Sequence, residues 1–493
     1  MENKLKFMKR TQIKNLSEKK GEEVLIQGWV DVKRDQGKMA FFDFRDATGK
    51  VQGVVFGKPE VLEIAKTLRP EWVVSVYGKV QERNDKQAKA YREALEEGKE
   101  KPFFNKDVEL EITGFEILNK AETPVFEITE STQDINEEVR LKHRYLDLRT
   151  ERMQKNIRMR AKAAKLLRDL LEKEDFIEIE TPILTKSTPE GARDYVVPSR
   201  LTPHHFYALP QSPQQYKQLL MSAGMERYFQ FAKCMRDEDL RGDRQPEFTQ
   251  LDMEMSFVTE EDIMALNEKL LISLVEKLYP EKRIQQIPFP RISYKEAMEK
   301  YGNDRPDIRE DKNDPNLLAF VWVVDFPFFE KTADSDDPQA QGEWTFTHNP
   351  FSLSKPEYIE DLKAGKNIEN IIASQYDIVL NGYEIGGGSI RAHDPEILRS
   401  ILSILGHSDE KIEENFGHML KALGSGTPPH GGIAWGFDRL MMILQNEKTI
   451  RELIAFPKNG EGREPMMESP SKITQAQLDE LHIQLKELPK KEE

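Results

Sequence analysis

At 493 residues the chain is long enough for two or three domains, and with 38% hydrophobic and 32% charged residues it has the composition of a globular protein with a polar surface. The net charge of −15 excludes general electrostatic coating of nucleic acid, although the first 50 residues carry 12 Lys and Arg against 8 Asp and Glu and leave room for a local basic face. The single cysteine, Cys234, excludes an internal disulfide and a metal site built from cysteines.

The N-terminal sequence MENKLKFMKR has neither the apolar segment nor the small-residue cleavage site of a secretory signal. The longest apolar run, LLAFVWVV at residues 317–324, is far shorter than the roughly 20 residues that span a bilayer. Together with the single cysteine, which suits a reducing compartment, these features predict a soluble, cytoplasmic protein.

The first part of the chain predicts a small β-barrel. Strand patterns occupy residues 23–35, 38–56 (two strands around a turn), 71–80 and 107–118. Five strands in so short a length are typical of a closed barrel. The charge-dense stretch at residues 83–107 is expected to be a helical excursion with a solvated face.

A change of pattern marks the end of this barrel. Residues 119–140 combine Pro, Ser and Thr without a clear periodicity, and we interpret them as an interdomain hinge. Beyond them, long helices alternate with long strands, which indicates an α+β arrangement. We therefore expect a barrel domain at 1–118, an α+β domain at 141–475 and a C-terminal tail at 476–493.

Residues 237–246 form a charge-rich connection between two predicted strands, too long for a tight hairpin. Side chains of the second strand alternate between its faces: Gln250, Asp252, Glu254 and Ser256 on one, Thr249, Leu251, Met253, Met255 and Phe257 on the other. We expect the strand to bury the apolar face and to present the acidic one. Either the loop is solvated and held by local ion pairs, or Arg236 and its neighbours bind a polyanion, which suits the planar guanidinium.

Two glycine-rich stretches follow. GGIAWGFDRLMMIL at residues 431–444 predicts a strand that runs into a helix, with Asp438 as the N-cap and Arg439 in the first turn. NGYEIGGGSIR at residues 381–391 places three glycines on a strand. Close approach of a ligand explains these glycines better than a β-bulge, which stays open as the alternative.

PQSPQQYKQLL at residues 210–220 predicts the start of a helix. Ser212 is the expected N-cap, Pro213 takes the first helical position and Gln215 completes a capping box. Gln214 and Lys217 then lie on one face of the helix.

Taken together, these stretches resemble the motifs of class II aminoacyl-tRNA synthetases, and specifically of bacterial-type aspartyl-tRNA synthetases. The matching segments are FIEIETPIL (176–184, motif 1), RDEDLRGDRQPEFTQLDME (236–254, motif 2), GGIAWGFDRL (431–440, motif 3), and the aspartyl signatures at 188–200, 209–220 and 381–391. The resemblance covers residues 24–475. It implies an OB-fold anticodon-binding domain, followed by a catalytic domain built on an antiparallel sheet flanked by helices.

The resemblance implies a ligase that activates L-aspartate with ATP and Mg²⁺ and transfers it to tRNA(Asp), in a homodimer joined through motif 1. Whether tRNA(Asn) is also a substrate stays open. One rival is an asparaginyl-tRNA synthetase, against which the paired cations Lys217 and Arg391 argue. Another is a catalytically inactive RNA-binding paralogue, against which the retained motif residues argue. One departure from the family is the expected absence of its extra domain between motifs 2 and 3, because residues 301–309 lead almost directly into 317–329.

The resemblance also assigns roles to individual residues. Arg236, Arg439 and Glu384 are the expected catalytic residues. The expected ATP ligands are Arg236, Glu238, Gln245, Glu384 and Arg439, and the expected Mg²⁺ ligands are Asp377 and Glu384, whose hard oxygens suit that ion. The expected aspartate ligands are Glu190, Ser212, Gln214, Lys217, Asp252, Arg391 and His348, although His348 could equally have a packing role.

The N-terminal barrel would hold anticodon bases by stacking and hydrogen bonding beside basic side chains. The resemblance places Arg34, Phe41 and Gln52 at the anticodon, with Lys33 and Lys38 at phosphates. From the residues alone, Phe41 could equally belong to the core of the barrel.

Overall fold

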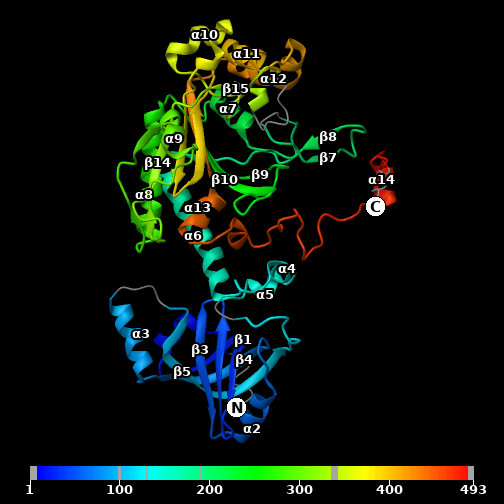
Figure 1. Cartoon of the computed structure of the whole chain (residues 1–493). Helices are drawn as coiled ribbons and strands as arrows, with labels where there is room; N and C mark the ends of the chain where they lie inside the picture. The colour runs from blue at the N-terminus through cyan, green and yellow to red at the C-terminus, as the bar shows by residue number, and fades with distance from the viewer. Residues whose placement is uncertain (1–7, 98–101, 129–130, 188–190, 335–341, 487–493) are drawn as a thin grey trace. The chain divides into compact units, whose positions relative to one another are not determined.

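The computed structural model describes residues 8–97, 102–128, 131–187, 191–334 and 342–486 (Figure 1). Its contacts divide the chain into two compact units, Met1–Thr129 and Glu130–Glu493. No helix within the described ranges is long and apolar enough to cross a membrane.

The first unit is the expected barrel. Its described residues form a closed sheet in the order β1 (Glu23–Asp35), β2 (Met39–Asp46), β3 (Gly49–Phe56), β5 (Phe104–Asn119) and β4 (Val73–Glu82). Alternating side chains fill its interior, as strand geometry requires. On β2, Phe42 and Phe44 are buried in this core, whereas Phe41 lies on the opposite face and is half-buried.

Two helices interrupt the barrel strands. α2 (Pro59–Thr67) lies between β3 and β4, and α3 (Lys86–Glu96) lies within the predicted helical excursion. The N-cap of α3 is Asp85, whose side chain accepts the backbone N–H of Ala88. The helix buries only Ala88 and Tyr91, so the prediction of a largely solvated helix is confirmed.

The second unit is built on a large sheet. Its described strands run in the order β12 (Arg291–Ser293), β14 (Phe320–Val324), β17 (Gln375–Leu380), β18 (Tyr383–Ile390), β19 (His430–Gly436), β10 (Glu247–Ser256), β9 (Arg227–Met235) and β6 (Ile177–Glu178). The inner strands pair antiparallel, whereas the edge strands β12 and β6 pair parallel to their neighbours. The predicted antiparallel sheet is therefore confirmed for its centre and wrong for its two edges.

Helices flank this sheet, as expected. α6 (Glu151–Glu172), α8 (Glu260–Leu278) and α13 (Phe437–Leu444) share one apolar core with it. A separate core joins α10 (Ile359–Ala364), α11 (Pro395–Ile404) and α12 (Asp409–Leu423), which lie together in Figure 1. The other described α-helices of this unit are α4 (Glu137–Lys142), α5 (Arg144–Asp147), α7 (Gln214–Ser222), α9 (Tyr294–Tyr301) and α14 (Gln475–Glu480). Short strands also pair outside the large sheet: β7 (Val196–Pro198) with β8 (Phe206–Ala208), β11 (Arg283–Ile284) with β13 (Leu317–Leu318), and β15 (Phe329–Lys331) with β16 (Trp344–Phe346).

The β9–β10 hairpin corrects part of the sequence prediction. Leu251, Met253 and Met255 lie in the core, as the alternation predicted. The acidic face is not exposed, however, because α7 covers it and leaves Asp252 and Glu254 at most 1% exposed. Phe257 is 69% exposed, because β10 ends at Ser256 and the positive φ of Phe257 turns the chain away.

A buried ion network ties the start of the second unit to a short 3₁₀ helix, η5 (Ile450–Leu453). The Glu452 carboxylate lies 2.9 Å from Arg140 and 2.8 Å from Arg152. Burial by itself raises the pKa of Glu452, but the two arginines outweigh it and lower the pKa to about 2.

The Glu452 network predicts a specific loss of stability in acid. Because folding lowers this pKa from its usual 4.5, the stabilising contribution is complete above that value and is lost as the pH falls toward 2. The contribution is on the order of 3 kcal/mol. We expect Glu452→Gln to lower the free energy of unfolding at neutral pH. We also expect the variant to lose less of that free energy than the wild type between about pH 5 and about pH 3.

Urea unfolding at each pH measures both effects. Glu413→Gln is the control, because Glu413 forms an exposed ion pair with Arg399 and should change neither quantity. Equal acid sensitivity in Glu452→Gln and the wild type would contradict the assignment.

Candidate active site

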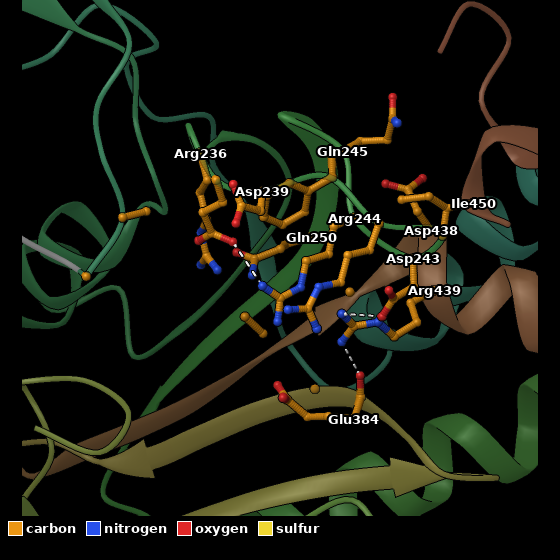
Figure 2. Close-up of a pocket in the computed structure, with 18 of the residues that line it drawn as sticks. Arg236, Asp239, Asp243, Arg244, Gln245, Gln250, Glu384, Asp438, Arg439 and Ile450 are labelled. Atoms are coloured by element: carbon orange, nitrogen blue, oxygen red, sulfur yellow. Dashed lines mark hydrogen bonds and ion pairs between the residues drawn. The ribbon is translucent and has the colours of Figure 1, made fainter. Parts of the chain in front are cut away.

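A cavity of about 900 Å³ opens in the second unit, between segments far apart in the sequence. Its lining includes the β9–β10 loop, the start of β18 and the start of α13 (Figure 2). Of the predicted site residues, it brings together Arg236, Glu238, Gln245, His348, Glu384 and Arg439. The fold therefore gathers the residues expected to bind a nucleotide.

Two arginines of the cavity each pair with an acid of the β9–β10 loop. Arg439 lies 3.1 Å from Asp243 and also donates to the backbone oxygen of Glu384 (Figure 2). Arg244 lies 3.5 Å from Glu238. The loop thus contains local ion pairs, as one of the two sequence alternatives required, and its basic groups still face a cavity.

Arg236 is oriented by two contacts. Its guanidinium lies 5.2 Å from the centre of the Phe248 ring and donates to the carbonyl of Gln211 at 3.4 Å. Gln245 also lines the cavity, but its amide forms two hydrogen bonds with the backbone of Lys458, at 3.1 and 2.9 Å. Gln245 therefore connects the loop to the segment after η5.

The start of α13 differs from the prediction. The helix begins at Phe437 with Gly436 as its N-cap, so Asp438 lies inside the first turn. Asp438 accepts the backbone N–H of Thr249 at 2.7 Å and pairs with Arg160 of α6 at 2.5 Å. Tertiary contacts, rather than helix capping, thus explain this aspartate, while Arg439 remains in the first turn.

Three potential metal ligands meet at one end of the cavity. One ligand atom from each of His348, Asp377 and Glu384 lies within 4.8 Å of the others. His348 Nε2 is 3.5 Å from Asp377 Oδ2. Burial lowers the pKa of His348, but the carboxylates of Asp377 and Glu384 outweigh this effect and raise the pKa to about 9. For Asp377, burial raises the pKa to about 6, although His348 acts in the opposite direction.

The three glycines of β18 pack against protein atoms. A Cβ on Gly388 would lie 2.1 Å from the Gly432 oxygen, and one on Gly387 would lie 2.7 Å from Asp377. The register with β17 shifts at Ile385, which is a β-bulge. The β-bulge kept open as the alternative is therefore present, at Ile385, and the surrounding protein atoms leave no room for side chains at the three glycines.

Behind the cavity lies a fully buried cluster of four charged side chains. Lys217 of α7 pairs with Asp252 at 2.6 Å and with Glu254 at 3.2 Å. Arg391 binds the same Glu254 through Nε at 2.9 Å and NH2 at 3.3 Å. Gln250, two residues before Asp252 on the same face of β10, lines the cavity, so the cluster continues its wall.

The cluster is electrically balanced, because two carboxylates face the two cations. Glu254 is not among the site residues predicted from the sequence, although the strand alternation placed it beside Asp252. Room for Glu254 depends on Gly432, where a Cβ would lie 2.2 Å from Glu254 Oε2. Burial raises the pKa of Asp252 despite Lys217, whereas Arg391 and Lys217 outweigh burial and lower that of Glu254.

The cluster keeps unused hydrogen-bonding capacity. Of the five N–H groups of Arg391, two bond to Glu254 and one to Ser389, so two remain within the described structure. Asp252 Oδ1 accepts from Lys217, whereas the buried Oδ2 has no hydrogen bond among the described residues. The nearby Tyr228 hydroxyl lies 3.2 Å from Gln230 Oε1, to which it donates, and also interacts with the Asp252 carboxylate.

The remaining predicted aspartate ligands are only partly placed. Ser212 accepts the backbone N–H of Gln214 at 3.2 Å, but α7 begins at Gln214 with Pro213 as its N-cap and has no capping box. The Gln215 side chain, which was expected to complete the capping box, instead places its Oε1 2.8 Å from His418 Nε2. Glu190 lies outside the described residues.

The predicted anticodon residues share one face of the barrel in the first unit. Arg34 pairs in register with Phe41, and Gln52 with Asp43. Arg34 is 3.0 Å from the Asp43 carboxylate. Gln52 donates to Glu109 of β5 at 3.0 Å, so Glu109 joins this face although the sequence had not singled it out.

Known protein families match both units of the chain. Residues 136–460 match the family described as tRNA synthetases class II (D, K and N), and residues 24–118 match the OB-fold nucleic acid binding domain. An aspartate–tRNA ligase of Macrococcus caseolyticus is 37% identical, over 94% of this chain and 96% of the relative. An aspartate–tRNA(Asp) ligase of Deinococcus radiodurans is also 37% identical, over 97% of this chain and 100% of the relative.

Solved structures support the fold. Asparaginyl-tRNA synthetase from Pyrococcus horikoshii, complexed with asparaginyl-adenylate, matches with a TM-score of 0.70 at 23% identity. The match covers 91% of this chain and 98% of that protein. Aspartyl-tRNA synthetase from Entamoeba histolytica has a TM-score of 0.68 at 21% identity, with 92% of each chain covered. With its barrel, its sheet and its matched relatives, the chain belongs to the class II aminoacyl-tRNA synthetases and, within them, to the aspartate–tRNA ligases.

Proposed function

We propose that the chain activates L-aspartate with ATP and transfers the aspartyl group to the 3′ end of tRNA(Asp). A carboxylate oxygen of aspartate bonds to the α-phosphorus of ATP as pyrophosphate leaves. A hydroxyl of the terminal tRNA nucleotide then attacks the carbonyl of the adenylate, and AMP leaves. These substrates are cytoplasmic, and we place the protein in the cytoplasm.

The observation that carries this proposal is the unused hydrogen-bonding capacity of the buried cluster. Arg391 offers two N–H groups and suits a planar carboxylate. Asp252 Oδ2 offers an acceptor, which suits an ammonium. Aspartate provides both complementary groups. Asparagine would instead present an amide donor to the donors of Arg391, which disfavours the asparaginyl alternative.

ATP fits the adjoining cavity. We assign the α-phosphate to Arg236 and the γ-phosphate to Arg439, where fixed guanidinium groups would stabilise the charge that develops as pyrophosphate leaves. Glu238 and Gln245 lie on the adenine side of this assignment. Because the Arg439 guanidinium pairs with Asp243 at 3.1 Å, phosphate must displace that carboxylate when ATP binds.

Mg²⁺ fits the acids at the end of the cavity. The carboxylates of Asp377 and Glu384 provide oxygen ligands within 4.8 Å of each other, the donor type that this ion prefers. When bound, the ion neutralises charge on the phosphates. His348 lies 3.5 Å from Asp377 beside these acids and would contact the substrate there.

We assign residues 1–118 to anticodon binding, 119–140 to a hinge, 141–475 to catalysis and 476–493 to a tail. Whether tRNA(Asn) is accepted as well stays open: the Bacillus subtilis relative is named for both tRNAs, whereas the Deinococcus radiodurans relative is named for tRNA(Asp). The gathering of the predicted ATP ligands at one cavity weighs against an inactive RNA-binding paralogue.

We further propose a homodimer joined near motif 1. Exposed apolar side chains concentrate around the sheet edge at β6 and in the following segment: Ile177, Ile183, Leu184, Val196, Leu201 and Phe206. Such a concentration is typical of an interface. The family's motif 1 lies in the same part of the chain.

The extra domain between motifs 2 and 3 is proposed to be absent. Residues 302–316 connect α9 directly to β13, and β14 follows within the main sheet. The alignment with the Macrococcus caseolyticus relative spans 593 positions, although the chain has 493 residues, so the relative carries segments that this chain lacks.

Replacing Arg391 tests the choice of amino acid. We expect Arg391→Leu to lower kcat/KM for aspartate by about 10³-fold in ATP–pyrophosphate exchange, and to narrow the preference for aspartate over asparagine, because the fork that reads the carboxylate is gone. Arg391→Lys keeps the charge without the fork and should recover only part of the loss.

Arg152→Leu is the matched control, because it also strands buried acids, Glu447 and Glu452, but lies outside the cavity. It should lower the thermal midpoint without changing the amino-acid preference. A wild-type kcat/KM for aspartate in Arg391→Leu would refute the substrate assignment.

Replacing Glu384 tests the metal site. We expect Glu384→Gln to raise the Mg²⁺ concentration for half-maximal pyrophosphate exchange by about 10–100-fold, because an oxygen ligand is lost. Titration of the protein with Mn²⁺, followed by its electron spin resonance, should show the same loss without turnover. Glu247→Gln, at the partly exposed start of β10, should leave both measurements unchanged.

Replacing Phe41 tests the barrel face. Loss of a stacking ring should weaken tRNA binding by about 1–3 kcal/mol, so we expect Phe41→Ala to slow aminoacylation and to leave pyrophosphate exchange unchanged. Ile64→Ala is the control, since Ile64 is 40% exposed on α2 outside this face. An equal fall in aminoacylation and exchange would argue against an anticodon role.

A further inference from the structure

Helix α7 carries two glutamine–histidine pairs on different sides. Gln218 Nε2 lies 3.1 Å from His430 Nε2, at the start of β19 and beside the charged cluster. Gln215 Oε1 lies 2.8 Å from His418 Nε2, on α12 and away from that cluster. The chain thus contains a pair next to the proposed aspartate site and a similar pair outside it.

The protonation of His430 follows from its partners. Its Nδ1 lies 2.8 Å from the Pro428 carbonyl, which can only accept, so Nδ1 carries the proton. His430 is completely buried, and burial lowers its pKa, although Glu254 opposes this effect. The ring is therefore neutral, and its Nε2 accepts a hydrogen bond from the Gln218 amide nitrogen.

This hydrogen bond fixes the direction of the next one. With its nitrogen turned to His430, Gln218 presents Oε1 to the Gln214 amide nitrogen, one helical turn earlier, at 3.0 Å. Gln214 Oε1 then makes no hydrogen bond within the described structure. A carbonyl oxygen in the proposed substrate site can accept from an ammonium, whereas a rotated amide would present N–H donors to it.

We infer that His430 and Gln218 are positioning residues, which hold the Gln214 amide with its oxygen available to the α-ammonium of the amino-acid substrate. The inference rests on the proposed aspartate activation and adds residues that position the ligand of the α-ammonium. The Pro428 carbonyl fixes which nitrogen of His430 carries the proton, and this fixes the donor and acceptor ends of Gln218 and then of Gln214. Each of these three buried side chains must keep its orientation for the next to form its hydrogen bond.

The His418 pair shows that a glutamine–histidine contact does not by itself set this direction. There the glutamine oxygen faces the ring, so His418 Nε2 must donate. The two contacts have opposite polarity although both glutamines lie on α7. The Pro428 carbonyl at the other ring nitrogen accounts for the polarity at His430.

The test measures KM for aspartate, KM for ATP and kcat in pyrophosphate exchange. Losing a hydrogen bond to a charged group corresponds to about a tenfold or larger change, so we expect Gln218→Leu to raise KM for aspartate by about tenfold, with changes below about threefold in kcat and in KM for ATP. The control Gln215→Leu should leave all three values near those of the wild type.

A double-mutant cycle separates positioning from general loss of packing. If Gln218 acts through Gln214, Gln218→Leu should add little to KM for aspartate in a Gln214→Leu background, whereas Gln215→Leu should stay independent of it. Additive effects of Gln214→Leu and Gln218→Leu would overturn the inference, and so would an unchanged KM for aspartate in a folded Gln218→Leu protein.

Variants of His430 provide a second route if Gln218→Leu does not fold. His430→Gln can still offer an acceptor to Gln218 and should keep KM for aspartate within about threefold of the wild type, whereas His430→Leu should raise it as Gln218→Leu does. Equal KM values in these two variants would overturn the inference. Failure of the wild type to activate aspartate would instead refute the proposed function, so the two failures are distinguishable.

Discussion

The pairing of Glu254 with both Arg391 and Lys217 is the interaction on which the site depends. Arg391 and Lys217 come from segments far apart in the chain, and they meet only because β10 carries a buried carboxylate between them. A buried cation without such a partner would be strongly unfavourable, and one left unpaired would shift its pKa or move into water. Glu254 thus holds the cations in place, and substrate recognition can use the hydrogen bonds that this pairing leaves unused.

Backbone packing makes this pairing possible. β19 lies so close to its two neighbours that a side chain at Gly388 of β18 would overlap the Gly432 oxygen, and one at Gly432 would overlap the Met253 oxygen and the Glu254 side chain of β10. Strands β18 and β19 carry Glu384 and His430, and they end beside Arg391 and Arg439. Because Gly388 and Gly432 carry no side chains, these strands can pack closely, and the cavity and the buried cluster lie next to each other.

The balance of charge also explains how so many basic side chains can gather in this part of the second unit. Acids occupy the groups that substrates are proposed to bind: Asp243 lies at Arg439, Asp377 at His348, and Asp252 and Glu254 at Lys217. Each pairing offsets part of the cost of burying a cation. At Arg439, a phosphate of ATP would exchange one anionic partner, Asp243, for another.

The sequence predicted the barrel, the α+β unit and the alternation of β10, because these depend on local periodicity and on turn residues. Through resemblance it also named six of the residues that line the cavity. Its errors concern properties that local patterns do not contain. The acidic face of β10 looked exposed because nothing near it in sequence indicated that α7 would cover it, and Asp438 looked like a helix cap because Arg160 and Thr249 are distant in the chain. The amino-acid sequence establishes which chemical groups this protein has and predicts most of the elements that carry them. Which of those groups neutralise one another, and which keep a hydrogen bond to offer, depends on the fold, because burial and the partners contributed by distant strands set both.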